Sequence, residues 1–311
     1  MVLPERKLIS RIARAARTRS HALVRGIGDD CAVLRPPRGH EILVTTDFSL
    51  ENVHFRRDWH PADSAGHRCL TRGLSDIAAM GGDPLAVFLS FALPVDLPQR
   101  WADGFLRGLL KLAAKFKLPL AGGDIAQSPG GGVLADIIVI GSAPRGQALL
   151  RSGARPGDAI YVTGVLGRSA AVIQQLRRGR KLRVAQNRAY FYPEPRIAVG
   201  RALRRFATAA IDLSDGLSTD LSHICEESGV GAVLYAESVP VAKGASLELA
   251  LHGGEDYELL FTAAPRTRIA DQIAGIRVTR IGEIIRGNRA FLADRQGRRR
   301  PLPARGWEHF R

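Results

Sequence analysis

Acidic residues recur beside glycine, serine or threonine along the chain, and their side chains could together hold a divalent cation. They occur in the groups Gly28-Asp29-Asp30, Thr45-Thr46-Asp47, Ser75-Asp76, Gly122-Gly123-Asp124, Asp212-Leu213-Ser214-Asp215-Gly216 and Gly253-Gly254-Glu255-Asp256. A turn or a helix cap, where Asp accepts backbone N–H bonds, explains any single group. As a set without paired His or Cys, they supply the hard oxygen ligands that suit Mg²⁺ better than Zn²⁺.

A magnesium site of this composition indicates a substrate that carries phosphate, because Mg²⁺ is usually held by a few carboxylates together with phosphate oxygens. The usual phosphate-binding loop is missing. No GxxxxGK[ST] string occurs, and the nearest glycine spacing, Gly141 to Gly146, is followed by Gln147. The HRD and DFG signatures of protein kinases are absent as well. If the chain uses ATP, metal ions on carboxylates must neutralise much of the phosphate charge.

The elements that must position these residues follow a mixed α/β (α+β) pattern. Apolar runs predict strands at 42–46, 85–93, 133–140, 159–163 and 257–262, and helical patterns occur at 63–80, 98–116 and 216–228. A polar, turn-rich segment at 151–158 separates two parts of this pattern. We therefore expect an N-terminal domain over 1–148 and a C-terminal domain over 149–311.

Composition indicates an ordinary globular protein. The 311 residues are 45% hydrophobic, which is enough for a substantial core, and no apolar run approaches the ~20 residues that span a bilayer. The N-terminal segment has a basic amphipathic pattern without a secretory apolar region. Cys31, Cys69 and Cys225 form no CxxC pair. We expect a cytoplasmic protein with reduced thiols and no membrane partner.

The formal net charge of +15 raises nucleic-acid binding as an alternative, with basic runs at 177–183 and 298–300. No helix-turn-helix, zinc-finger or aromatic RNA-binding signature accompanies these runs. Attraction of small polyanionic substrates uses the same charge and needs no further partner. Nucleic acid is therefore the less favoured partner.

The chain resembles the thiamine-monophosphate kinase family in a series of strings that run in order along it. These are GIGDDCAVL, TTDFSLENVHF, SDIAAMGGDP, GGDIAQSPG, LLRSGARPGD, IDLSDGLSTDL and GGEDYELLF, followed by Gly306-Trp307-Glu308-His309-Phe310. Their combination covers nearly the whole chain and is far more specific than any single motif. The resemblance implies the two-domain architecture of the aminoimidazole ribonucleotide synthetase superfamily, with ATP between the domains and a homodimer formed through the N-terminal domain.

The resemblance also implies a reaction and a set of site residues. ATP would transfer its γ-phosphoryl group directly to thiamine monophosphate, giving thiamine pyrophosphate without a covalent catalytic residue. Several Mg²⁺ ions would be held by Asp30, Thr45, Thr46, Asp47, Asp76, Asp124, Asp212 and Asp215. ATP would contact Gly123, Asp124, Arg151 and Ser214, and thiamine monophosphate would contact His54, Glu255 and Trp307. Without the resemblance, His54 and Trp307 are interpreted as packing residues and Arg151 as a solvated charge.

The sequence departs from the family pattern at three positions. Asn52 stands where a glycine is expected, and Ile125 and Gln127 replace residues that are often Thr and Arg. Two alternatives stay open: another ATP-using enzyme of the superfamily, or a non-catalytic nucleotide-binding or nucleic-acid-binding homologue. Selenophosphate synthetases would be expected to carry a reactive cysteine near the N-terminus, whereas the first cysteine here is Cys31, inside a predicted metal motif.

Overall fold

The computed structural model describes residues 3–16, 20–28 and 30–310, so Asp29 of the first acidic group lies outside the described residues. The chain divides into two compact units. The first unit contains Met1–Ile77, Gly82–Gly146 and Phe191–Glu194, and the second contains Ala78–Gly81, Gln147–Tyr190 and Pro195–Arg311. The main break follows Gly146, next to the expected boundary at 148. A single boundary does not describe the division fully, because Ala78–Gly81 belongs to the second unit and Phe191–Glu194 to the first.

A four-stranded sheet in the order β3-β6-β4-β5 forms the centre of the first unit. The strands are β3 (His40–Leu50), β6 (Leu134–Pro144), β4 (Asp83–Leu93) and β5 (Leu120–Gln127). β4 and β5 run parallel, and the other neighbours run antiparallel. The three strands predicted in this part of the sequence are confirmed, with longer bounds than the apolar runs suggested.

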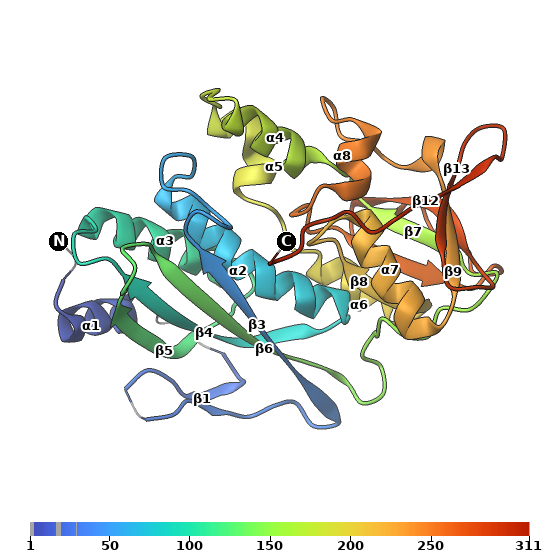
Figure 1. Ribbon diagram of the computed structural model, residues 1–311. Helices are drawn as coiled ribbons and strands as arrows, with labels where there is room; N and C mark the ends of the chain where they lie inside the picture. The colour runs from blue at the N-terminus through green and yellow to red at the C-terminus, as the bar shows by residue number, and fades with distance from the viewer. Residues whose placement is uncertain (1–2, 17–19, 29, 311) are drawn as a thin grey trace. The chain divides into compact units, whose positions relative to one another are not determined.

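Two helices, α2 (Ala62–Ala79) and α3 (Gln99–Lys115), cover one face of this sheet (Figure 1). Gly73 of α2 lies so close to β6 that an added Cβ would meet Val139 Cγ2 at 2.6 Å. The ring of Phe105 on α3 stacks on Phe91 of β4 with 4.5 Å between the ring centroids. Because side chains alternate along a strand, Val139 and Phe91 mark the face that the helices bury.

The opposite face of the sheet is less covered. Ile42, Val44 and Phe48 alternate along β3 and are 46%, 66% and 59% exposed. Helix α1 (Glu5–Ala15) contacts β5, and the short strands β1 (Leu23–Arg25) and β2 (Val33–Leu34) pair with each other. The open part of this face is therefore an apolar surface along β3.

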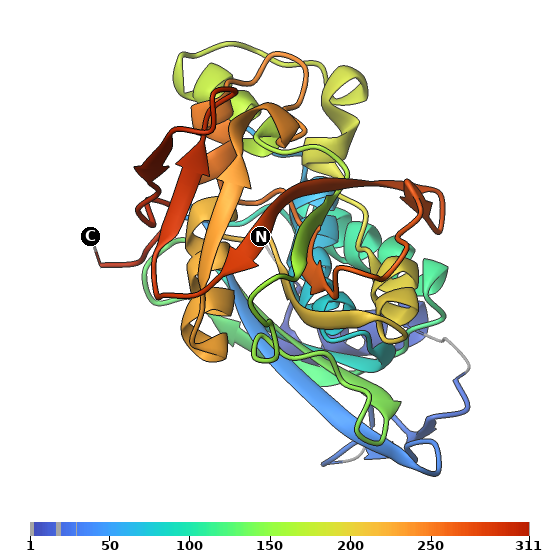
Figure 2. The same cartoon turned by 90° about the vertical axis from the view of Figure 1, so that its right-hand side faces the viewer.

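The second unit is built on a larger sheet in the order β14-β13-β9-β12-β7-β10-β8, with β11 paired to β12. The strands are β7 (Ala159–Thr163), β8 (Ala207–Asp212), β9 (Gly231–Tyr235), β10 (Leu259–Ala263), β11 (Gln272–Ile273), β12 (Ile276–Ile285), β13 (Ala290–Ala293) and β14 (Arg299–Pro301). Only β9 and β13 pair in parallel among the described strands of this sheet. Figure 2 shows β9 (orange) and β13 (red) side by side, although they are distant in the sequence.

The helices of this part of the chain are α4 (Arg168–Arg177), α5 (Arg188–Phe191), α6 (Ile197–Leu203), α7 (Leu217–Ser228) and α8 (Leu247–His252), with 3-10 turns η1 (Val184–Asn187) and η2 (Ala236–Ser238). Leu217, Leu221 and Ile224 lie on one face of α7 and pack in a buried core with Ile211 of β8 and Leu260 of β10. Their helical spacing is the pattern that predicted a helix over 216–228. In the part of the chain that the structure describes, no helix combines the length and apolarity that crossing a membrane requires.

Candidate functional site

The adjacent residues Thr45 and Thr46 point to opposite faces of the first unit's sheet. Thr45 Oγ1 donates a hydrogen bond to Asp76 Oδ2 on α2. Thr46 Oγ1 donates to Asp136 Oδ1 on β6 at 2.7 Å. This division follows from the alternation of side chains along β3. The side chains of the predicted Thr45-Thr46-Asp47 group are therefore split, with Thr45 and Asp47 on the helix-covered face and Thr46 on the open face.

Asp47 has a cationic neighbour that the sequence analysis did not identify. Arg72 of α2 is buried, and its Nη1 lies 3.8 Å from Asp47 Oδ1. Arg72 and Asp76 are four residues apart, so they lie on the same face of α2. The helix thus brings one cation and one carboxylate to the same strand. The i,i+4 spacing was visible in the sequence, but the strand that this helix face contacts was not.

A row of polar residues crosses the open face of the same sheet. Asp136 of β6 is paired in register with Ser90 of β4, and Ser90 is paired with Asp124 of β5. Residues in direct register point to the same face, and strands are spaced at ~4.8 Å, so the backbones of Asp136 and Asp124 are about 10 Å apart. Asp136 was not among the site residues predicted from the sequence, because a single Asp inside an apolar run is typical of an ordinary strand.

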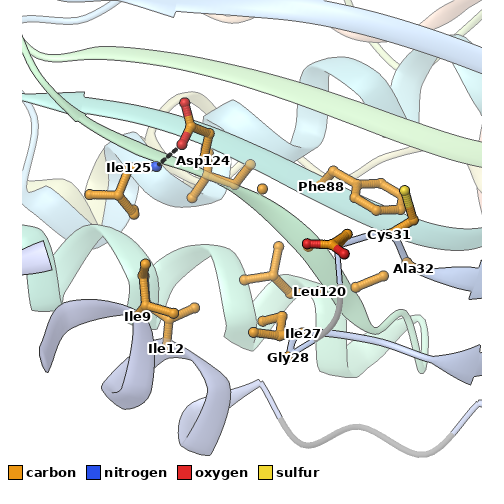
Figure 3. Close-up of a pocket in the computed structure, with 15 residues that line it drawn as sticks. Ile9, Ile12, Ile27, Gly28, Cys31, Ala32, Phe88, Leu120, Asp124 and Ile125 are labelled. Atoms are coloured by element: carbon orange, nitrogen blue, oxygen red, sulfur yellow. Dashed lines mark hydrogen bonds between the residues drawn. The ribbon is translucent and has the colours of Figure 1, made fainter. Parts of the chain in front are cut away.

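A cavity of about 500 Å³ opens beside Asp124 (Figure 3). Its lining includes Ile9 and Ile12 of α1, Phe88 and Leu120 of the sheet, and the predicted site residues Asp30, Gly123 and Asp124. Apolar walls with a few polar groups are typical of a small-molecule site of this volume. The first unit therefore brings three of the predicted ligand-binding residues to one cavity.

Backbone geometry explains why Gly123 is a glycine. Its φ is 150°, and an added Cβ would lie 2.0 Å from the Leu89 carbonyl oxygen. The next side chain, Asp124, is exposed, and its Oδ1 accepts the backbone N–H of Ile125 at 2.9 Å. The Gly-Gly-Asp group is thus a close approach of two strands that ends in an exposed carboxylate.

His54 and Asn52 lie in the turn after β3. The Leu50 N–H donates to His54 Nδ1 at 3.0 Å, and the His54 side chain is half-buried. Asn52 has a φ of 67°, in the left-handed region that Asn tolerates better than most residues other than glycine. Asn52, where a glycine was expected, is therefore compatible with the left-handed backbone of this turn.

In the second unit, a further group of carboxylates lies at the carboxyl end of β8. Asp212 ends the strand, Ser214 and Asp215 follow it, and α7 begins at Leu217. Asp220 of α7 is only 1% exposed, and its Oδ2 accepts the N–H groups of Asp215 at 3.2 Å and Gly216 at 2.9 Å. Asp220 was not among the site residues predicted from the sequence either, because one Asp in the first turn of a helix is typical of a cap.

The electrostatics of this group favour a bound cation. Burial, followed by the charges of Asp212 and Asp215, holds the pKa of Asp220 well above its usual range. Carboxylates that repel one another in this way are stabilised in their ionised form by a nearby positive charge. In the part of the chain that is described, no group of three or more His, Cys, Asp or Glu is arranged to hold a metal ion by protein atoms alone. These oxygen donors fit Mg²⁺ that is shared with substrate phosphates, because Mg²⁺ usually takes only one or two carboxylates from a protein.

Glu255 lies on a loop whose backbone is hydrogen-bonded to the residues after β8. Its N–H donates to the Ser214 carbonyl at 2.7 Å, and the Tyr257 N–H donates to the Leu213 carbonyl at 2.9 Å. Both Glu255 and Tyr257 are left-handed, with φ of 66° and 51°. Such non-glycine residues cost about 1–3 kcal/mol each and persist only where the surroundings fix them.

Trp307 is brought to the same place by backbone hydrogen bonds. Its N–H donates to the Asp215 carbonyl at 2.9 Å, and the preceding Gly306 N–H donates to Thr219 Oγ1 at 2.9 Å. The Trp307 residue is 48% exposed, so its ring is open to a ligand. Arg151, also in the second unit, is exposed, and its carbonyl accepts the Ser228 hydroxyl at 3.1 Å. The structure thus joins Ser214, Asp215, Glu255 and Trp307 through their backbones.

Comparisons with known proteins identify the family. Residues 28–143 match the family model of the AIR synthase related protein, N-terminal domain, and residues 155–295 match that of its C-terminal domain. The thiamine-monophosphate kinase of Escherichia coli (strain K12) is 38% identical over 327 residues, which cover 100% of this chain and 99% of that protein. The chain belongs to the thiamine-monophosphate kinase family.

Solved structures from the thiamine-monophosphate kinase family have the same fold. The enzyme from Stenotrophomonas maltophilia K279a aligns with a TM-score of 0.83 at 35% identity over 94% of this chain and 97% of that one. AaThiL complexed with AMPPCP and TMP aligns with a TM-score of 0.79 at 28% identity over 100% of both chains. The family and the two-domain α/β architecture inferred from the sequence strings are confirmed.

Proposed function

We propose that this chain uses ATP to phosphorylate thiamine monophosphate to thiamine pyrophosphate, in the biosynthesis of that cofactor. The observation that carries the proposal is the end-to-end match to AaThiL, a relative whose structure contains AMPPCP and TMP. Both groups of carboxylates described above, one in each unit, lie within the segments that match the family models. The proposed reaction therefore draws on residues from both units.

The metal-binding roles rest on the chemistry of the donors. In the first unit the proposed ligands of Mg²⁺ are Asp30, Thr45, Thr46, Asp47, Asp76 and Asp124, and in the second they are Asp212 and Asp215. Bound Mg²⁺ ions would neutralise phosphate charge during transfer. The opposite orientations of Thr45 and Thr46 assign their side chains to different environments. One of them would serve the metal only through its backbone carbonyl or through a water molecule.

The nucleotide would be recognised by Gly123, Asp124, Arg151 and Ser214. Support comes from the cavity beside Gly123 and Asp124, whose apolar walls suit a flat aromatic base. Arg151 is exposed and therefore available to a phosphate, which Arg binds with two parallel hydrogen bonds. The proposed nucleotide contacts are thus Gly123 and Asp124 in the first unit and Arg151 and Ser214 in the second.

Thiamine monophosphate would be recognised by His54, Glu255 and Trp307. The half-exposed Trp307 ring can stack on the cationic thiazolium of the substrate. The Glu255 carboxylate can accept hydrogen bonds from the aminopyrimidine. The backbone bonds that join Glu255 to Ser214 and Trp307 to Asp215 place both side chains beside the second carboxylate group.

The chemistry needs no covalent nucleophile from the protein. The acceptor oxygen belongs to a phosphate that is already ionised near neutral pH, so little general-base help is required. Repulsion between anions is the larger obstacle, since two unit charges ~4 Å apart interact by ~4 kcal/mol at an effective dielectric constant near 20. Residues that hold cations and orient donor and acceptor in line would therefore supply most of the rate acceleration.

We further infer that the protein acts as a cytoplasmic homodimer and that the first unit forms the dimer contact. The support is the apolar surface of β3, where Ile42, Val44 and Phe48 are exposed. Large apolar side chains that are exposed together on one face of a strand mark interaction sites. A second copy of the same surface would cover these side chains.

The activity is tested by incubating the purified protein with ATP, Mg²⁺ and thiamine monophosphate. We expect equal amounts of ADP and thiamine pyrophosphate, no product without metal, and none from free thiamine. Glu255→Gln should raise the KM for thiamine monophosphate, whereas Glu248→Gln, which changes an exposed carboxylate on α8, should not. ATP binding without any thiamine pyrophosphate would overturn the proposed function.

A further inference from the structure

We propose that Asp256 is a positioning residue for thiamine monophosphate. Its carboxylate joins the loop at 253–257 to the start of helix α4 by hydrogen bonds and so holds Glu255 in its left-handed conformation. The inference rests on the proposed function, because it concerns the residue that would recognise the substrate's aminopyrimidine. Asp256 itself need not touch the substrate.

The first support is the way in which α4 is capped. The residue before this helix is Gly167, which has no side chain to accept the free N–H groups of the first turn. Asp256 Oδ2 accepts the Gly167 N–H at 2.6 Å, and Oδ1 accepts the Ser169 N–H at 3.3 Å. Helix caps usually come from the residue directly before the helix. Here the cap comes from a loop 89 residues further along the chain, so it also joins two separate segments.

Steric crowding keeps this arrangement from being replaced by a local cap. Gly167 has a φ of 81°, and a Cβ at this position would lie 2.7 Å from the Ala250 backbone nitrogen. Any Ser, Thr or Asp at 167 would therefore collide with α8. The helix start depends on the carboxylate of Asp256, which the helix dipole also favours.

The second support is that the same helix turn binds the backbone of Glu255. Ser169 Oγ donates to the Glu255 carbonyl at 2.8 Å, and the Glu255 N–H donates to the Ser214 carbonyl at 2.7 Å. Glu255 is thus held at its N–H, at its carbonyl and through the side chain of the next residue. Two of these three restraints come from α4.

The third support is the backbone strain on either side of Asp256. Glu255 and Tyr257 have φ of 66° and 51°, a region that non-glycine residues rarely adopt. Without the carboxylate at 256, the loop would be free to relax toward ordinary φ values. Glu255 would then leave the position beside Ser214 and Asp215. Burial raises the pKa of Asp256 to about 7, which means that burying the ionised carboxylate costs free energy. An acid that is present in spite of this cost is expected to serve as a hydrogen-bond acceptor.

The test separates positioning from simple stabilisation by comparing Asp256→Asn with Ser246→Ala. Ser246 caps α8 by accepting the Leu249 N–H at 3.2 Å, and this cap holds no residue of the 253–257 loop. We expect Asp256→Asn to raise the KM for thiamine monophosphate about tenfold, with kcat and the KM for ATP within about twofold of wild type. Ser246→Ala should lower Tm by a similar amount and leave every kinetic constant unchanged.

A second variant and a binding measurement keep the proposal falsifiable if Asp256→Asn folds poorly. Ser169→Ala removes the hydroxyl bond to Glu255 but keeps the cap, and it should raise the same KM by about threefold. Equilibrium dialysis of labelled thiamine monophosphate with the full chain should show weaker binding by matching factors. Wild-type KM for thiamine monophosphate in a folded Asp256→Asn or in Ser169→Ala would overturn the positioning role. Wild-type protein that makes no thiamine pyrophosphate would instead overturn the proposed function, so the two failures are distinct.

Discussion

Arg196 and Glu258 form an ion pair with two hydrogen bonds in the second unit, with Arg196 Nε 2.7 Å from Glu258 Oε2 and Nη2 2.5 Å from Oε1. Glu258 is buried, and its Oε2 also accepts the Thr163 hydroxyl at 2.6 Å. Thr163 Oγ1 in turn accepts the Leu259 N–H at 2.8 Å. The pair therefore anchors the end of the 253–258 segment to β7, directly after the strained loop that carries Glu255.

Removal of the cation from this pair should destabilise the protein strongly. Arg196→Met leaves a buried carboxylate without a compensating charge, which typically costs about 3–5 kcal/mol of unfolding free energy. The double variant Arg196→Met with Glu258→Gln should recover much of that loss, because no buried charge remains. Urea denaturation, monitored by circular dichroism, measures the unfolding free energy of the single and the double variant. Arg298→Ala, which breaks an exposed ion pair with Asp294, is the control and should leave the unfolding free energy nearly unchanged.

Substitution of the proposed metal ligands should affect turnover far more than folding. Asp47→Asn and Asp215→Asn keep side-chain volume while removing a ligand charge, so kcat should fall by about a hundredfold or more, and the Mg²⁺ concentration for half-maximal rate should rise. Steady-state assays over a Mg²⁺ titration, with Tm measured in parallel, check this expectation. Asp58→Asn changes an exposed carboxylate that pairs with Arg56 and should behave as wild type. Undiminished turnover in either ligand variant would remove that residue from the site.

Asp256 should make stability depend on pH. Its pKa is raised from 3.8 to about 7 in the folded protein, chiefly by burial, so the folded state binds the proton more tightly than the unfolded chain does. Between about pH 4 and pH 7 the unfolded state loses this proton first, and the contribution of Asp256 to stability therefore falls as pH rises. The unfolding free energy of wild type minus that of Asp256→Asn, measured by urea titration at several pH values, should decline across this window. A difference that rises with pH would contradict the assignment.

The C-terminal segment that carries Gly306 and Trp307 should be sensitive to a single added methyl group. A Cβ at Gly306 would lie 2.3 Å from the Asp215 carbonyl oxygen and 2.6 Å from Thr219 Oγ1. Gly306→Ala should therefore displace Trp307 and raise the KM for thiamine monophosphate by about three- to thirtyfold, the loss expected for a stacked cation. Because the displaced Trp307 is 48% exposed, Tm should change little. Gly130→Ala, where an added Cβ meets no atom within 4 Å, is the matched control in the same assay.

The proposed dimer contact on β3 can be tested by a charge. Val44→Glu places a carboxylate in the centre of the exposed apolar surface, and burying it against a second copy would be strongly unfavourable. We expect sedimentation velocity to show a dimer for wild type and a monomer for this variant. Val95→Glu alters a side chain of similar exposure, 62% against 66%, outside β3 and should remain dimeric. A wild-type monomer at micromolar concentration would refute the proposed contact.

Several features could be predicted from the sequence alone because their causes are local. Apolar runs indicated the strands β3, β4 and β6 of the first unit, and the 3.6-residue spacing of Leu217, Leu221 and Ile224 indicated α7. The acidic groups beside glycines indicated hard-oxygen chemistry, and the ordered strings indicated the family. Each of these signals is contained in a short stretch of chain.

Tertiary structure decided the partners of these residues and the faces on which they lie. Thr45 meets Asp76 because α2 covers its face of β3, whereas Thr46 meets Asp136 because both side chains point to the opposite face of the neighbouring strands β3 and β6. The cap that Asp256 provides to α4 joins segments 89 residues apart. Contacts at such separations depend on strand register and helix packing, which arise from the burial of many side chains at once. Local sequence therefore determined the kinds of ligand groups, and long-range packing determined their arrangement.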